Sequence, residues 1–132
     1  MATSAGGGVG NVVSYKSAAD LSSYQYRFVT LSAANTVNLS GGTNEMPEGV
    51  LINKPASTSA ASDVQIDGIA KLSMNGTCAY GNVLCSGTDG RGLLADATGD
   101  VHVRAKALEA ASAAGDIISV RLINQLGTTA GL

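Results

Sequence analysis

The fold class is decided by VHVRAKA, residues 101–107, in which the odd positions are apolar and the even positions are polar. A strict period of two is typical of a β-strand that buries one face. A second alternating stretch, ISVRL, occupies residues 118–122. The Ala-rich residues 109–114 between them are too few for helix propensity to outweigh a turn. We therefore expect the two stretches to pair as a hairpin.

The rest of the chain repeats this pattern in shorter pieces. Apolar runs recur at Tyr26–Leu31, Thr36–Leu39, Gly49–Ile52, Val64–Ile66, Ile69–Leu72, Val83–Cys85, Leu93–Ala95, Val101–Leu108 and Ile117–Ile123. Dipeptides that accept tight turns separate several of them: Gly41-Gly42, Asp67-Gly68, Asn75-Gly76 and Asp89-Gly90. Many short strands with Gly-rich turns predict an all-β fold, a small Gly-rich β-barrel or sandwich.

The predicted domain boundaries follow from a change in the sequence pattern. Residues 1–24 contain a glycine cluster and no apolar period, so we expect a flexible, extended N-terminal arm. Residues 25–124 form the predicted barrel domain, and residues 125–132 form a C-terminal tail.

The composition points to a structural or binding protein. Gly, Ala, Ser and Thr make up nearly half of the 132 residues, and only 14% are charged. Burial is worth ~25 cal/mol per Å² and therefore rewards large side chains, so a core of small residues is marginal without self-association or docking. A net charge of −2 argues against nucleic-acid binding, and the chain has no apolar run long enough to span a membrane. It also shows no signal peptide, so we expect synthesis in the cytoplasm.

The sequence offers no catalytic or cofactor site. The glycine cluster at 6–10 lacks the Lys-Ser/Thr ending of a phosphate loop. Cys78 and Cys85 have no second pair and no nearby His, so they are expected to be free thiols, unless a turn brings them close enough for a disulfide. His102 has no nucleophile that sequence logic would pair with it. Two carboxylates could still meet in space, as in a small hydrolase, but we expect no enzyme, metal or cofactor.

Positive charges gather around the hairpin. The polar face of 101–107 and its partner strand is expected to present His102, Arg104, Lys106 and Arg121. Such a cationic stripe is either an ordinary solvated sheet face or a docking face for an acidic partner.

The order of several segments resembles the capsid cement (decoration) proteins of tailed bacteriophages. The matching pieces are GVLINKPA (49–56), DVQIDGIAK (63–71), AYGNVL (79–84), DGRG (89–92) and ALEAASAAGDII (107–118). The resemblance as a whole covers roughly residues 20–122. The cations on residues 102, 104 and 106 and the glycine-rich N-terminus depart from the family pattern, so capsid contacts transfer least well.

The resemblance implies a small β-barrel that assembles as a homotrimer on the outer surface of an expanded capsid. There it would bridge neighbouring major capsid proteins and resist internal pressure from DNA. The location would then be the virion. A rival class of function is a small receptor- or glycan-binding β-module on a virion surface.

Candidate capsid contacts lie in and after the predicted arm. We expect residues 1–27 to lie along the capsid, with Tyr15, Lys16, Tyr24, Tyr26 and Arg27 as contacts, because aromatic side chains give large contact areas at low entropic cost. The alternative is that Tyr24 and Tyr26 pack on the barrel itself.

Overall fold

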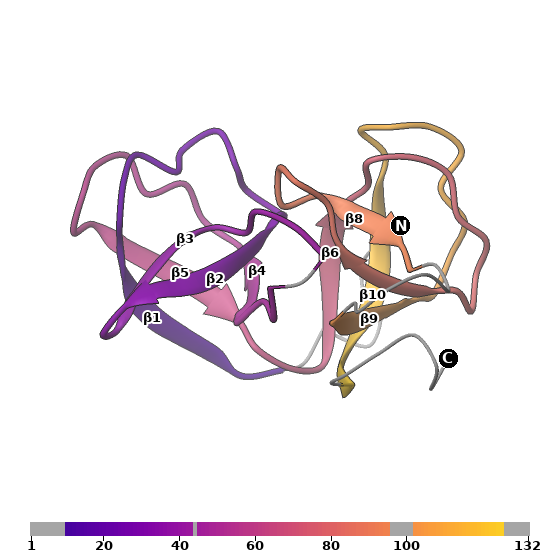
Figure 1. Cartoon of the computed structure of the whole chain (residues 1–132), viewed down its shortest axis with the longest axis horizontal. Coiled ribbons are helices and arrows are strands. Elements are labelled where there is room, and N and C mark those ends of the chain that lie inside the picture. The colour runs from indigo at the N-terminus through magenta and orange to yellow at the C-terminus, as the bar shows by residue number, and fades with distance from the viewer. Residues whose placement is uncertain (1–9, 44, 96–101, 126–132) are drawn as a thin grey trace.

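The computed structural model describes residues 10–43, 45–95 and 102–125 (Figure 1). Ten strands follow one another along the chain: β1 (Val12–Ser17), β2 (Phe28–Ala33), β3 (Thr36–Leu39), β4 (Gly49–Leu51), β5 (Ala61–Gln65), β6 (Ile69–Ser73), β7 (Val83–Ser86), β8 (Gly92–Leu94), β9 (Val103–Ala107) and β10 (Ile117–Gln125). The described ranges contain no helix. The predicted all-β fold class is therefore confirmed.

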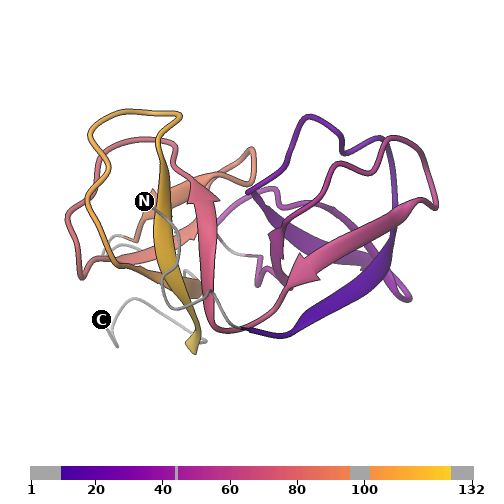
Figure 2. The same ribbon diagram turned by 180° about the vertical axis from the view of Figure 1, so that it is seen from behind.

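The strands form two five-stranded units, which lie side by side in Figures 1 and 2. The first half of the chain makes a closed barrel in the order β1-β3-β2-β4-β5. Strand β1 closes it, because β1 pairs antiparallel with β5 and parallel with β3. The second half makes a sheet in the order β6-β10-β9-β7-β8. The chain passes between the two units through residues 66–68.

The predicted flexible arm over residues 1–24 is wrong for Val12–Ser17, which form β1. This strand has no apolar alternation: its first three side chains are exposed, and its one fully buried residue is Ser17. The Ser17 hydroxyl forms a hydrogen bond with the hydroxyl of Ser62 inside the barrel. Backbone pairing with β5 holds the strand, and this leaves no hydrophobic signal in the sequence. Residues 1–9 of the predicted arm lie outside the described residues.

The predicted barrel over residues 25–124 is two units rather than one, since the barrel starts at Val12 and the chain leaves it after Gln65. The nine apolar runs each overlap a strand. The predicted hairpin is confirmed, because β9 and β10 pair antiparallel. Of the predicted tail, Gln125 ends β10 and residues 126–132 lie outside the described residues.

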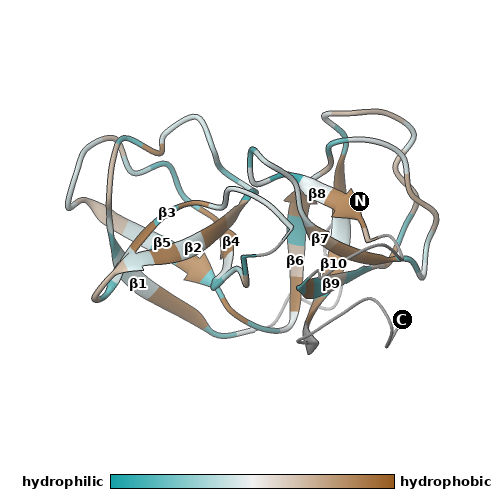
Figure 3. Ribbon diagram, viewed as in Figure 1, coloured by the Kyte–Doolittle hydropathy of each residue, from teal (hydrophilic) through white to brown (hydrophobic). Residues whose placement is uncertain are grey.

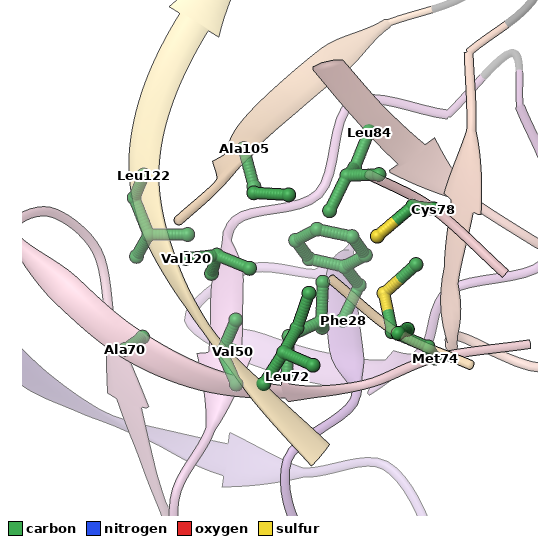
Figure 4. Packing of buried hydrophobic residues seen from close by; sticks show 13 residues of the cluster. Phe28, Val50, Ala70, Leu72, Met74, Cys78, Leu84, Ala105, Val120 and Leu122 are labelled. Carbon is green, nitrogen blue, oxygen red and sulfur yellow. The ribbon is translucent and has the colours of Figure 1, made fainter. Parts of the chain in front are cut away.

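The barrel contributes side chains to the hydrophobic core of the second sheet. Along β2, Phe28 faces the second sheet while its neighbour Val29 faces the barrel interior, and along β4 Val50 and Leu51 divide in the same way. This follows from the alternation of side chains along a strand. Figure 3 shows how hydrophobic and hydrophilic residues are distributed along the strands. Figure 4 shows the Phe28 ring among side chains of the second sheet. Burying one such ring is worth roughly 1.5–3 kcal/mol, so the barrel contributes directly to the stability of the sheet.

The second sheet comes close to closing on itself. Its edge strands are β6 and β8, and an isolated parallel bridge joins Met74, just after β6, to Gly92 at the start of β8. A Cβ atom on Gly92 would lie 2.6 Å from Met74 Sδ and 2.7 Å from Leu72 Cδ2. Only glycine allows this approach, so the bridge depends on the absence of a side chain at this position.

Candidate interaction surfaces

Arg104 is not on an exposed sheet face, and this part of the predicted cationic stripe is wrong. The residue is only 4% exposed. Its guanidinium donates to four backbone carbonyls: Nε to Pro47 (3.0 Å), Nη1 to Ile123 (3.1 Å), and Nη2 to Glu48 (2.9 Å) and Ile66 (2.7 Å). Arg104 therefore connects the second sheet to the barrel through its side chain.

The surroundings of Arg104 explain why the alternating pattern wrongly predicted an exposed side chain at this position. The N-terminal part of β9 lies against the barrel. The barrel therefore covers the polar face of this part of the strand, and the apolar face is buried as well. Burial lowers the pKa of Arg104, an effect that the charges of Glu48 and Asp67 partly offset. His102 is half-buried just before the strand, and its backbone N–H donates to the Thr43 carbonyl (2.9 Å). The Nδ1 atom of His102 is buried without a hydrogen-bond partner among the described residues.

The other two residues of the stripe do lie together. Lys106 on β9 and Arg121 on β10 are directly opposite each other. Lys71 on β6 lies opposite Ser119, two residues before Arg121 on the same strand. Lys71 and Arg121 are exposed and Lys106 is half-buried, while the residues that alternate with them are buried. We call Lys71, Lys106 and Arg121 the cationic face.

No carboxylate of the described residues lies within 4.0 Å of the charged nitrogens of the cationic face. Glu109 is near it in the fold, but its Oε2 accepts the backbone N–H of Ser119 (2.8 Å). That hydrogen bond lowers the pKa of Glu109. The cationic face thus carries net positive charge on a protein whose formal net charge is −2.

A second group of charges lies where the barrel meets the second sheet. The Arg27 guanidinium stacks over the Tyr24 ring, 5.1 Å from its centroid, and approaches Asp89 at 3.9 Å. Arg91 forms the closer ion pair with Asp89, at 2.8 Å. Burial alone would raise the pKa of Asp89, but the hydrogen bonds from Arg91 and the charges of both arginines hold it below its ordinary value. We call Tyr24, Arg27, Asp89 and Arg91 the junction cluster.

Tyr26 sits at the same junction in a conformation unusual for its type. Its φ of 68° lies in the left-handed region, which non-glycine residues adopt at a cost. Its N–H donates to the Leu51 carbonyl (2.7 Å), and its carbonyl accepts from the Ser73 N–H (2.7 Å). The ring lies under the Lys71 ammonium, 5.5 Å from the centroid. These contacts fix Tyr26 between the two units.

The remaining predicted contacts are on β1. Tyr15 packs against the barrel core, and its hydroxyl donates to Glu48 Oε2 (2.6 Å). Burial, together with that hydrogen bond, raises the pKa of Tyr15 to about 12. Lys16 is exposed on the outside of the barrel. Of the five predicted contacts, then, Tyr24, Tyr26 and Arg27 come together at the junction, whereas Tyr15 and Lys16 lie apart from them on β1.

Two surface residues are not among the predicted site residues. Lys71 was not grouped with the other cations, because only the pairing of β6 with β10 brings it beside them. Tyr80 is 77% exposed at the second position of the turn Ala79–Asn82. The Asn82 N–H donates to the Ala79 carbonyl, and Gly81 at the third position has a φ of +86°. A Gly in this place is the signal of a type II turn, and it could have indicated an exposed corner.

The described residues show no cluster suited to metal chemistry. No group of three or more His, Cys, Asp or Glu side chains within them is placed to hold an ion. Cys78 and Cys85 are buried and are not joined by a disulfide. A surface hollow of about 420 Å³ on the barrel has the lining residues Thr30, Leu31, Ser32, Asn38, Leu39 and Glu45. Among the described residues, no helix has the length and apolar character needed to cross a membrane.

Comparison with known proteins rests on structure alone. No family model and no curated protein sequence matches the chain. Among solved structures, the chain is similar to the head fiber gp8.5 N base of bacteriophage phi29, with a TM-score of 0.66 and 14% sequence identity. The alignment covers 88% of this chain and 96% of that chain. At this identity, the likeness shows that the two chains share a fold.

Proposed function

We propose that this protein is a structural component of a bacteriophage virion, where it binds the outer surface of the expanded capsid and stabilises it. The observation that carries the proposal is the fold it shares with a head fiber base, over nearly the whole of that chain. The ordered segments that resemble the cement proteins support it from the sequence side.

The proposed stabilisation is mechanical. The bound protein bridges neighbouring major capsid proteins, so that separating two of them first requires breaking its contacts. A ligand that binds only the assembled state stabilises that state, by about 2.7 kcal/mol at a hundredfold excess over its Kd. Many equivalent sites on one shell add up to a large total effect. The mechanism includes no catalytic step and no cofactor.

Self-association is part of the proposal, in the form of the homotrimer that the resemblance implies. The largest fully buried side chain is Phe28, and most of the other fully buried large side chains are Leu or Val. An interface between copies would add buried area to this modest core. Light scattering of the purified protein tests the assembly directly, and a monomer at micromolar concentration would contradict the trimer.

The experiment for the function uses expanded capsids that lack this protein. Purified protein is mixed with them, and binding is measured by co-sedimentation with quantification of both chains. We expect saturable binding at a fixed ratio to the major capsid protein and no binding to unexpanded shells. Loaded capsids should also release DNA at a higher temperature than bare ones.

Absence of binding at micromolar protein would overturn the proposal. Screens against glycans and host receptors would then test the rival function, a receptor- or glycan-binding module. Binding to expanded and unexpanded shells alike would also contradict the proposal, because it would remove the dependence on the mature surface.

A further inference from the structure

The cationic face combines like charges in a way that does not favour the isolated protein. Lys106 and Arg121 are directly opposite each other on neighbouring strands. Like charges in this position destabilise a sheet, whereas opposite charges stabilise it. Lys71 adds a third cation near Arg121. No described carboxylate lies within 4.0 Å of the charged nitrogens of these side chains, and the charged nitrogen of Lys71 contacts the Tyr26 ring.

Several carboxylates elsewhere in the described structure have side-chain partners. Carboxylates on the barrel and at the junction accept hydrogen bonds from side chains, namely Glu48 from Tyr15, Asp63 from Ser14, Asp67 from Asn11 and Asp89 from Arg91. The three cations of the cationic face, in contrast, have no described carboxylate within 4.0 Å of their charged nitrogens. A surface that retains unpaired charge of one sign is suited to a partner of the opposite sign.

Exposed aliphatic side chains border the same face. Ile117 is 48% exposed and precedes Ser119 by two residues on β10, so it points to the same side of the sheet. Leu108 is 41% exposed, and its N–H donates to the Ser119 carbonyl (3.0 Å). Interfaces between proteins combine apolar contact with complementary charge in this manner.

We propose that the cationic face, with Leu108 and Ile117 at its border, docks an acidic protein segment whose Asp or Glu side chains pair with Lys71, Lys106 and Arg121. The inference builds on the proposed function, in which the segment belongs to the capsid surface. Nucleic acid fits less well, because the face has only three cations and the whole protein repels a polyanion through its net charge of −2.

The decisive variant is Arg121→Glu, tested in the full chain. It replaces a repulsive cross-strand pair with an attractive one, so the variant should unfold at a slightly higher temperature than the wild type. Its binding to immobilised poly-L-glutamate at low ionic strength should weaken about tenfold or more. Lys106→Glu should behave in the same way. Lys54→Glu, an exposed cation in the loop after β4, is the matched control and should bind with less than a twofold change.

A gain in stability together with a loss of binding separates docking from misfolding. Equal binding of poly-L-glutamate by Arg121→Glu and wild type would overturn the inference, as would an equal loss in Lys54→Glu. Tighter binding of duplex DNA than of poly-L-glutamate, with the loss confined to the same variants, would also overturn it in favour of nucleic acid.

Expanded capsids distinguish failure of the inference from failure of the proposed function. If wild type and Arg121→Glu bind capsids equally, the docking surface is wrong and the capsid function stands. If wild type binds poly-L-glutamate through the cationic face but does not bind capsids, the function fails and the acidic-segment site stands. Loss of capsid binding in Arg121→Glu, with binding retained in Lys54→Glu, supports both.

Discussion

The barrel and the second sheet have the same number of strands but differ in how each obtains its core. The barrel closes on itself through β1 and fills its interior with its own side chains, among them Leu21, Val37 and Val64. The second sheet stays open between β6 and β8 and takes Phe28 and Val50 from the barrel into its core. The comparison indicates that the barrel is the supporting unit and the sheet the dependent one.

The largest effect on stability should come from removing the Phe28 ring, which the barrel contributes to the core of the second sheet. Phe28→Ala should cost about 3–5 kcal/mol of unfolding free energy, since it leaves a cavity in a packed core. Native-state hydrogen exchange should show faster exchange in β6–β10 than in the barrel. The matched variant Val29→Ala removes a neighbouring side chain from the barrel core. In this variant, hydrogen exchange should become faster in the barrel than in β6–β10. Equal acceleration in both units would contradict the dependence of one on the other.

Arg104 provides the second test, because it links the units through hydrogen bonds instead of packing. Arg104→Met should cost roughly 2–4 kcal/mol in urea unfolding, since it leaves buried carbonyl oxygens without donors. Arg121→Met removes the same group from an exposed position and should change stability by no more than about 0.5 kcal/mol. A small effect of Arg104→Met would mean that water replaces the guanidinium and that the link is not structural.

Tyr15 makes the barrel sensitive to alkaline pH. Its folded pKa of about 12 lies above the ordinary value of 10.0, so its contribution to stability is full below pH 10 and is lost as the pH rises through 12. We expect a loss of about 1 kcal/mol over this interval, allowing for partial solvent exposure. Tyr15→Phe should flatten the alkaline limb of a plot of unfolding free energy against pH. An unchanged slope would show that another group is responsible.

Asp89 makes the junction cluster sensitive to acidic pH, and its effect on stability should be the smallest of the four. Its folded pKa is lowered, so its contribution is present above the pKa of the unfolded chain, near 4, and is lost as the pH falls through the folded value. Asp89→Asn should reduce the free energy of unfolding that is lost between pH 5 and pH 2 by no more than about 1 kcal/mol, because the ion pairs are partly exposed. Thermal unfolding from pH 5 to pH 2 measures this. A steeper slope in the variant would contradict the assignment.

The strands that the sequence predicts well are those with an apolar pattern of their own. The bounds of β3 coincide with the predicted run, and the β9–β10 hairpin follows from alternation in both strands. β1 could not be found in this way, because backbone pairing holds it and its buried side chain is a serine.

The candidate surfaces were predictable where they depend on neighbours in one hairpin. Lys106 and Arg121 alternate with apolar residues, and the hairpin brings them together. Arg104 follows the same rule in the sequence, but the barrel covers it, and no local pattern shows a contact with residues more than fifty positions away. The stacking of Lys71 on Tyr26 is likewise set only by the packing of one unit on the other.

The single passage of the chain between the units at 66–68 has a consequence for dividing the protein in two. Each unit is contiguous in sequence, so cleavage between Asp67 and Gly68 would leave the barrel and the sheet as separate polypeptides. The barrel fragment would keep all of its own pairing, whereas the sheet fragment would lack Phe28 and Val50 from its core. The two pieces therefore form a natural complementation pair, in which the barrel fragment acts as a folding template and the sheet fragment acquires its structure only by capturing the Phe28 ring.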